Sequence, residues 1–204
     1  MSGAPPTVAA LYVDPNGVYA NLPGVEVWDE ARDARKYAGP WPVVAHPPCG
    51  TWSRNLCFVN EKRWGKKVGD DGGCFAAALE AVRAWGGVLE HPAYSVAWER
   101  FNLPRPGTGG WTSDFWDPGV TIEVSQVAFG HEARKRTWLY AVGCELPALT
   151  STEPRAVASV GANVHTGRTH GLPRISGRIV HLTPPAFRDV LLAMARSAAG
   201  AVDE

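Results

Sequence analysis

A cysteine just past an apolar segment is the first candidate for chemistry. Cys49 follows "VVAHPP", so two prolines separate the thiol from a predicted buried strand, and Gly50 comes next. Proline fixes the backbone and glycine permits close approach, so this loop can hold a thiol rigidly where a ligand reaches it. Such a thiol is placed to act as a nucleophile. The alternative is a small buried residue in a turn, because unreactive cysteines are usually buried.

Two further charged groups could complete a reactive site. Glu90 ends the apolar segment "GGVL". A protonated glutamate beside a thiolate can donate to a ring nitrogen while the thiolate attacks the ring. Arg134 and Arg136 stand two apart, so they share a face in an extended segment and suit a phosphate or a pyrimidine carbonyl. The alternatives are a helix cap or structural ion pair for the glutamate and a solvated edge strand for the arginines.

Strands and helices must position these residues. Short apolar segments bounded by turn residues predict strands over 7–14, 24–29, 41–46, 88–92, 121–130 and 136–143. Helical periodicity and capping residues predict a short helix or helical turn over 30–39, a clear helix over 72–87 and a C-terminal helix over 183–200. Pro15–Gly17 is predicted to be a turn, and 55–71 and 102–120 are predicted to be long loops.

This alternation predicts an α/β protein with a mostly parallel sheet. Functional residues then gather at the carboxyl ends of the strands. The residues placed there are Asp14, Asp29, Cys49 and Glu90. The 204 residues fit one domain, 1–204, and the 45% apolar content suffices for one core. Within that domain, 144–178 is predicted to be a small irregular insertion, rich in Gly, His and Arg.

Composition excludes several other classes of protein. The 20 Lys and Arg residues balance 20 Asp and Glu, so the basic signature of a strong nucleic-acid binder is missing, although a local basic patch stays open. The four cysteines form no Cys-x-x-Cys pair, and no metal site is predicted. No signal peptide or membrane span is found, which predicts a soluble cytoplasmic protein.

The ordered motifs resemble those of the DNA cytosine-5 methyltransferases. That family carries a Pro-Cys loop, a Glu-Asn-Val strand end, a Gln-x-Arg-x-Arg strand and a Leu-Thr-Pro helix start. This chain has "HPPCGTWS", "LEHP", "FGHEARKRTWLYAVG" and "HLTPPAFRD" in that order, across most of 7–195. The resemblance implies a Rossmann-like methyltransferase-type sheet, mostly parallel with an antiparallel edge.

The resemblance also implies a reaction on DNA. Cys49 would add to C6 of a cytosine, Glu90 would hydrogen-bond N3 and the exocyclic amine, and Arg136, with Arg134, would hold O2 or a phosphate. A base in a duplex must be flipped out to be reached. The other predicted substrate-binding residues are Ser53, Arg54, Arg168, His170 and Arg174.

S-adenosylmethionine is the methyl donor that the resemblance implies. The stretch "WDEARDARKYAGPWPVVAHPPC" looks like the family's segment from an adenine-contacting aspartate to the nucleophile, which places that role on Asp29. The predicted cofactor-binding residues are Asp14, Asn16, Gly17, Trp28, Asp29 and Pro48.

The chain departs from the family pattern in four places. Only 14 residues separate Asp14 from Trp28, too few for the usual helix and strand, so the cofactor half is predicted to be truncated. His91 replaces the family's Asn and either acts as an acid–base group or packs. His131-Glu132 stands near the place of the family's Gln. About 35 residues replace the large target-recognition domain, which favours loose specificity or an accessory protein.

Several functions therefore stay open. The first is an enzyme acting at C5 of a pyrimidine in DNA. Its variants use a one-carbon donor other than S-adenosylmethionine, or act on a nucleotide. The second is a non-catalytic nucleic-acid-binding protein with a methyltransferase fold, against which the retained Cys49–Glu90 pair argues, because binding alone needs no nucleophile. A metal-dependent hydrolase using His46 and His91 has no ligand spacing to support it. The oligomeric state is not predicted.

Overall fold

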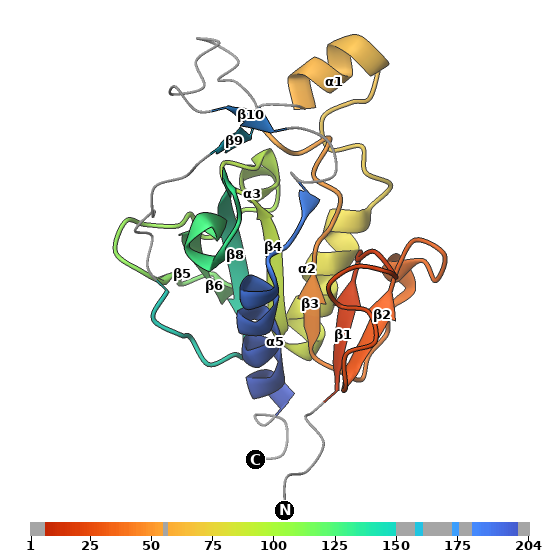
Figure 1. The fold of residues 1–204 in the computed structure, drawn as a ribbon, viewed down its shortest axis with the longest axis vertical. Coiled ribbons are helices and arrows are strands. Elements are labelled where there is room, and N and C mark those ends of the chain that lie inside the picture. Colours follow the sequence, from red (N-terminus) through yellow and green to blue (C-terminus); the bar gives the residue numbers. More distant parts are fainter. Residues whose placement is uncertain (1–6, 55–56, 150–157, 161–172, 176–180, 200–204) are drawn as a thin grey trace, which may run out of the picture.

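The fold is a mixed α/β architecture, described by a computed structural model over residues 7–54, 57–149, 158–160, 173–175 and 181–199 (Figure 1). Its centre is a seven-stranded sheet. The strands, in spatial order, are β2 (Val25–Trp28), β1 (Val8–Leu11), β3 (Val43–Ala45), β4 (Gly87–Pro92), β8 (Arg136–Val142), β6 (Asp117–Ser125) and β5 (Thr112–Asp114).

The sheet has a parallel half and an antiparallel half. β2, β1, β3 and β4 pair in parallel, whereas β8, β6 and β5 continue the sheet through antiparallel pairs. Because β6 runs in the same direction as β4, five of the seven strands point one way. The predicted α/β class and mostly parallel sheet are confirmed at this level, with a three-stranded antiparallel part.

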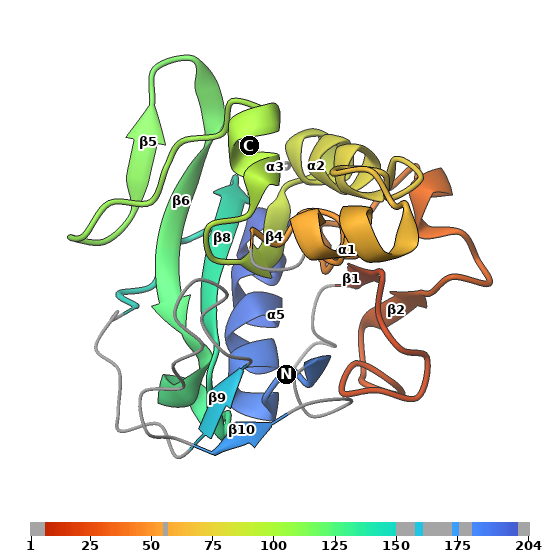
Figure 2. The same cartoon turned by 90° about the horizontal axis from the view of Figure 1, so that it is seen from above.

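Two helices cover opposite faces of the sheet. α2 (Cys74–Trp85) packs on β3, β4 and β8, and α5 (Pro185–Ala199) packs on β1, β3 and β4. Figure 2 shows β4 between the two helices. Side chains alternate along the buried strands, so Val88 joins the apolar cluster under α5 and Leu89 joins the cluster under α2. Burying one such side chain fully contributes about 1.5–3 kcal/mol.

The shorter elements complete the described chain. They are η1 (Ala34–Lys36), α1 (Cys57–Trp64), α3 (Val96–Arg100), η2 (Gln126–Phe129), β7 (Ala133–Arg134), β9 (Ala158–Val160) and β10 (Arg174–Ile175). β7, β9 and β10 form a small parallel sheet of their own. This small sheet and α1 lie beyond one end of the main sheet, at the top of Figure 1.

Several predicted boundaries differ from the structure. The predicted loop 55–71 contains α1, whose only buried residue is Cys57, so this helix has no apolar stripe to reveal it. The predicted loop 102–120 contains β5 and the start of β6, because β5 is a short polar edge strand. The predicted strand 121–130 ends at Ser125 and continues as η2. The short helix or helical turn predicted over 30–39 is the 3₁₀ turn η1.

The predicted irregular segment 144–178 falls largely outside the described residues, apart from 144–149, β9 and the neighbourhood of β10. No helix in the described part of the chain has the length and apolar character needed to cross a bilayer.

Candidate active site

Cys49 and Glu90 follow neighbouring parallel strands. β3 and β4 are in register through Val44 with Val88 and Ala45 with Leu89, so Glu90 lies level with the start of the loop that carries the thiol. Cys49 is half-buried, and the backbone N–H of Ser53 donates to its carbonyl at 2.8 Å, which closes a tight turn. This arrangement brings the predicted nucleophile and the predicted acid to one edge of the sheet.

The charges of the two groups interact directly. Burial raises the pKa of the Cys49 thiol, the negative charge of Glu90 raises it further, and the Lys135 ammonium partly offsets both effects. The thiol is therefore protonated at neutral pH in the free protein. A nucleophilic role requires that its proton leave as the substrate is attacked.

A hydrogen-bonded chain holds the Glu90 carboxylate. His46 Nδ1 lies 3.0 Å from Glu90 Oε2, and Tyr19 Oη lies 2.8 Å from His46 Nε2. On the other side, Gln126 Nε2 donates to Glu90 Oε1 at 3.0 Å and to Thr137 Oγ1 at 2.9 Å. Both carboxylate oxygens are thus engaged, and the side chain has one fixed orientation.

These partners also set the ionisation of Glu90. Burial opposes the charged form, but the hydrogen bond with His46 and the positive charge of Lys135 outweigh it, so the pKa of Glu90 is lowered well below its usual range. Glu90 is a carboxylate at neutral pH. In the His46 tautomer that fits this geometry, Nδ1 donates to the carboxylate and Nε2 accepts from the Tyr19 hydroxyl.

The cation beside Cys49 and Glu90 is Lys135, which lies between the two predicted arginines. Its charge lowers the pKa of both groups, and its Nζ donates to the Leu182 carbonyl at 3.1 Å. Leu139 lies opposite Glu90 in the pairing of β8 with β4, so their side chains share a face of the sheet. Every second residue of an extended chain points the same way, so residues 135 and 137 also lie on the face of Glu90.

The two arginines lie on different strands, Arg134 on β7 and Arg136 on β8. Arg136 makes two hydrogen bonds to Glu123, one of them from Nε at 2.7 Å, and its guanidinium lies 5.0 Å from the centroid of the Tyr94 ring. Its side chain is on the face of β8 that includes Trp138, opposite to the face of Glu90. Arg134 is exposed on β7. Arg136 is therefore directed away from the face that carries Glu90.

His91 packs in the core on the other face of β4. Its side chain is fully buried, with its ring centroid 5.1 Å from that of Phe75 and 6.3 Å from that of Trp98. Burial lowers the pKa of His91 to about 4, although the charge of Glu90 favours protonation. The packing role, rather than the acid–base role, fits this neutral and enclosed position.

Replacing His91 with leucine tests that role. From about pH 6.5 down to 4, the unfolded chain binds a proton at this histidine that the native protein does not, so native stability falls with pH. His91→Leu has no such proton to bind. Between neutral pH and pH 5, we expect its free energy of unfolding to fall by about 2 kcal/mol less than that of the wild type, as measured by urea unfolding. A folded variant that loses all covalent chemistry would instead support an acid–base role.

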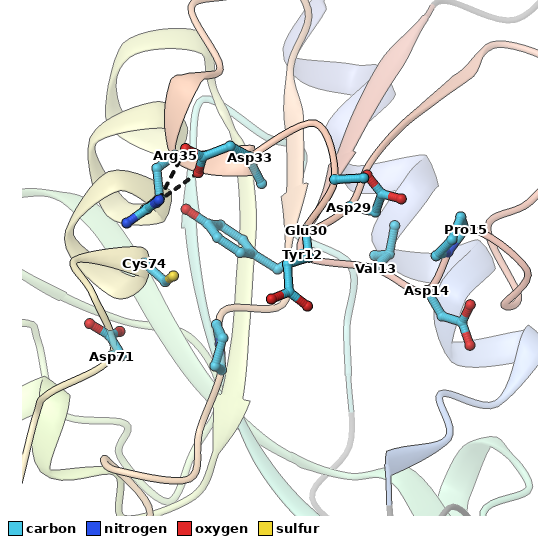
Figure 3. Close-up of a pocket in the computed structure, with 13 residues that line it drawn as sticks. Tyr12, Val13, Asp14, Pro15, Asp29, Glu30, Asp33, Arg35, Asp71 and Cys74 are labelled. Atoms are coloured by element: carbon cyan, nitrogen blue, oxygen red, sulfur yellow. Dashed lines mark hydrogen bonds and ion pairs between the residues drawn. The ribbon is translucent and has the colours of Figure 1, made fainter. Parts of the chain in front are cut away.

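A large acidic cleft opens beside Cys49, at the carboxyl ends of β1, β2 and β3. Its volume is about 970 Å³, and Pro48, the neighbour of the predicted nucleophile, lines it. The carboxylates that line it are Asp14, Asp29, Glu30, Asp33 and Asp71. One cation, Arg35, is among the lining residues, and Asp33 holds it through two hydrogen bonds of 2.7 and 3.0 Å (Figure 3). The cleft therefore carries excess negative charge.

The wall of this cleft has unusual backbone geometry. Tyr12 and Asp33 both line it with positive φ, at 60° and 55°, a conformation that costs a non-glycine residue about 1–2 kcal/mol. Such strain gathers at ligand sites. The Tyr12 hydroxyl is buried and has no hydrogen-bond partner among the described residues. A ligand in the cleft could satisfy that group.

Three of the six predicted cofactor residues line the cleft, namely Asp14, Asp29 and Pro48. The other three do not. Asn16 and Gly17 form the predicted turn, where both backbone N–H groups donate to Asp14 at 2.9 Å. Trp28 instead packs under the guanidinium of Arg32, 3.8 Å from its ring centroid.

The predicted substrate residues are only partly placed. Ser53 lies in the Cys49 turn, and Arg54 is exposed and pairs with Glu99 at 2.5 Å. Arg174 lies in β10, although its side chain is outside the described residues, as are Arg168 and His170 altogether. Among the residues that the structure describes, no group of three His, Cys, Asp or Glu side chains is arranged to hold a metal ion.

Four residues around Glu90 escaped prediction as parts of this site: Tyr19, His46, Gln126 and Lys135. His46 precedes the two prolines, so its proximity to Cys49 was readable from the sequence, but its contact with a strand 44 residues away was not. Tyr19 and Gln126 carry no local motif. Comparisons of the chain with family models, curated proteins and solved structures found no match. The case for a function is therefore made from the geometry of the site.

Proposed function

We propose that this protein modifies C5 of cytosine in DNA through a covalent bond between Cys49 and C6 of the base, with S-adenosylmethionine as the methyl donor. One observation carries the proposal. A thiol and a carboxylate whose charges interact follow neighbouring parallel strands, and Pro48, the residue before the thiol, lines the acidic cleft. A nucleophile, a ring-binding group and a donor site thus adjoin one another.

Cys49 would supply the nucleophile. Its sulfur bonds to C6 as the thiol proton passes to the Glu90 carboxylate, and the electrons of the C5–C6 double bond make C5 nucleophilic. After C5 has gained its new substituent, the C5 proton passes to solvent and the sulfur–C6 bond breaks, and N3 returns its proton through Glu90, which restores the ring and the free cysteine. Lys135 assists by favouring the thiolate.

Glu90 would bind the edge of the ring and carry the proton, and His46 with Tyr19 would hold the carboxylate in place. The carboxylate accepts a hydrogen bond from the exocyclic amine, while negative charge develops at N3 during the attack. Glu90 donates there after gaining the proton that leaves Cys49, while His46 Nδ1 holds Oε2 at a distance of 3.0 Å. Tyr19 in turn holds His46 through Nε2. Glu90 thus acts as a general acid.

The acidic cleft would hold the methyl donor. Its carboxylates suit the ammonium, sulfonium and ribose hydroxyls of S-adenosylmethionine, and its volume is in the range of small-molecule sites. The same charge disfavours folate-type donors, which are anionic. Asp14 and Asp29 are the residues we assign to binding. When bound, S-adenosylmethionine supplies an electrophilic methyl group.

Neutralising Asp29 tests the assignment of the cleft. Asp29 Oδ1 accepts from the Arg32 N–H at 2.9 Å, and asparagine can keep that hydrogen bond while removing the charge. We expect Asp29→Asn to weaken S-adenosylmethionine binding by about 10- to 100-fold in calorimetry. Asp114→Asn is the matched control, because Asp114 makes a similar turn hydrogen bond at the far edge of the sheet. If the wild type binds no S-adenosylmethionine, the donor is a different one.

Covalent trapping tests the reaction itself. A fluorine at C5 cannot leave as the proton does, so DNA containing 5-fluorocytosine should remain attached to Cys49 when S-adenosylmethionine is present. The expected product is a denaturant-stable protein–DNA adduct, identified by peptide mass spectrometry at residue 49. If the wild-type protein neither traps this DNA nor modifies any pyrimidine, the enzymatic proposal fails.

One observation favours the non-catalytic alternative. Burial keeps the free Cys49 thiol protonated at neutral pH, as expected for an inert cysteine. A nucleic-acid-binding protein of this kind would bind DNA with equal affinity whether residue 49 is cysteine or serine, and it would form no adduct. The trapping experiment therefore separates the two functions.

A further inference from the structure

α1 and the residues that follow it form an exposed arm beside the nucleophile loop. We define the arm as residues 57–67, and Figure 1 shows α1 projecting beyond the end of the main sheet. Cys57 is its only buried residue. Two hydrogen bonds tie its base to the Cys49 turn: Asn60 Nδ2 donates to the Gly50 carbonyl at 2.8 Å, and the Cys57 N–H donates to the Ser53 carbonyl at 2.8 Å.

The arm concentrates positive charge in a chain of zero net charge. Its four cations are Lys62, Arg63, Lys66 and Lys67, against one carboxylate, Glu61. All four cations are exposed, and none makes an ion pair with another described residue. Unpaired cations on an exposed segment attract a polyanion rather than stabilise the fold.

The arm also exposes aromatic surface to solvent. Trp64 is 65% exposed and Phe58 is 58% exposed, and the Arg63 guanidinium lies 5.1 Å from the Trp64 ring centroid. Exposed rings among unpaired cations are the combination with which proteins bind single strands, since rings stack on bases while cations follow the phosphates. A duplex would offer the phosphates but not the faces of its stacked bases.

We infer that the arm binds single-stranded DNA and delivers an unpaired cytosine to Cys49. The inference rests on the proposed function in one respect, the identity of the base that reaches the thiol. It specifies single-stranded DNA as the polymer that is bound. In a single strand, no base has to be flipped out of a duplex. The hydrogen bonds of Cys57 and Asn60 to the nucleophile turn place the bound strand next to the site.

A second exposed aromatic pair provides an internal control. Phe115 and Trp116 are 88% and 87% exposed at the turn between β5 and β6, where Asp114 precedes them and Asp117, ion-paired with Arg83, follows them. No lysine or arginine lies within five residues of them in the chain to contact a phosphate backbone. Trp64 and Trp116 thus have different electrostatic settings, and only Trp64 should contact DNA.

The experiment measures DNA binding without chemistry. Fluorescence anisotropy of a labelled deoxythymidine oligonucleotide is recorded with the Cys49→Ser protein and no methyl donor, so a failed reaction does not affect the result. Trp64→Ala should weaken binding by about tenfold or more, and Trp116→Ala should leave it unchanged. Replacing all four cations with glutamine should lower the slope of log K against log salt by about 3 in magnitude.

Three results would overturn the inference. The first is that the protein binds a duplex of matched length as tightly as the single strand, or more tightly. The second is that Trp116→Ala weakens binding as much as Trp64→Ala does. The third is that the protein binds single-stranded RNA tenfold more tightly than single-stranded DNA. A loss of trapping in the Cys49→Ser protein with DNA binding retained would leave the arm's role intact. A loss of binding in the arm variants alone, with free-nucleotide trapping retained, would leave the chemistry intact.

Discussion

Cys49→Ser should abolish both product formation and trapping on DNA containing 5-fluorocytosine. A serine hydroxyl is a far weaker nucleophile than a thiol, and Lys135 cannot ionise it near neutral pH. We expect the rate to fall by about 10⁴-fold or more, as when a covalent nucleophile is removed from other enzymes. The measurement is the single-turnover rate of adduct formation, resolved on denaturing gels.

A second cysteine provides the matched control for this change. Cys144 lies beyond the end of β8, where its thiol donates to the Gly87 carbonyl at 3.2 Å, at the start of β4 rather than at its carboxyl end. Cys144→Ser keeps a donor for that bond and should trap DNA at the wild-type rate. Equal trapping by Cys49→Ser and the wild type would place the covalent bond on another residue.

The raised pKa of Cys49 adds a pH signature to the wild-type reaction. Because burial holds the pKa above its ordinary value of 9.0, the thiolate fraction keeps increasing throughout the neutral and mildly alkaline range. Adduct formation should therefore accelerate with pH up to about pH 9 without reaching a plateau.

Glu90→Gln should produce the second-largest loss. Glutamine retains the shape and can still bond to Gln126 and His46, but it cannot carry the proton that N3 needs. General acid catalysis contributes about 10²–10⁴-fold, and we expect a fall of that size in the rate of adduct formation. Glu80→Gln, an exposed change on α2, controls for loss of charge.

His46→Gln tests whether His46 sets the ionisation of Glu90. This variant removes the hydrogen bond that lowers the pKa of Glu90, so that pKa should rise and the pH–rate profile should change shape. A purely structural His46 would alter unfolding without altering the profile. An unchanged rate in Glu90→Gln would remove the carboxylate from the mechanism.

The sequence revealed the elements with strong periodicity but missed those that face solvent. The strands on both sides of Cys49 are apolar and buried, and the stripe of Phe75, Leu79 and Val82 identifies α2, so their positions were predictable. α1 buries only Cys57, so its sequence has no apolar stripe at helical spacing. The arm's charges are visible in sequence, whereas their exposure beside the nucleophile turn is not.

The register of the strand explains the largest difference between the predicted and the observed site. Arg134 and Arg136 looked like the functional pair because they are two residues apart, yet the cation whose charge lowers the pKa of Glu90 is Lys135. A shift of one residue exchanges the two faces of a strand, and sequence spacing alone does not say which face meets the site.

The acidic cleft shows a similar limit of prediction from sequence. The short connection between β1 and β2 contains only turns, as predicted, and this brevity implied a truncated cofactor half. A cleft forms nonetheless, because Asp33, Asp71 and Cys74 complete its wall from segments well beyond that connection. Long-range assembly of this kind has no local sequence signal.

The most direct test of the central claim is mass spectrometry of nucleosides from the DNA of cells that make the protein. It reports the product without assuming a donor or a target sequence. The proposed function predicts 5-methyldeoxycytidine above the level in cells making Cys49→Ser. No modified pyrimidine in either culture, or the same amount in both, would contradict it.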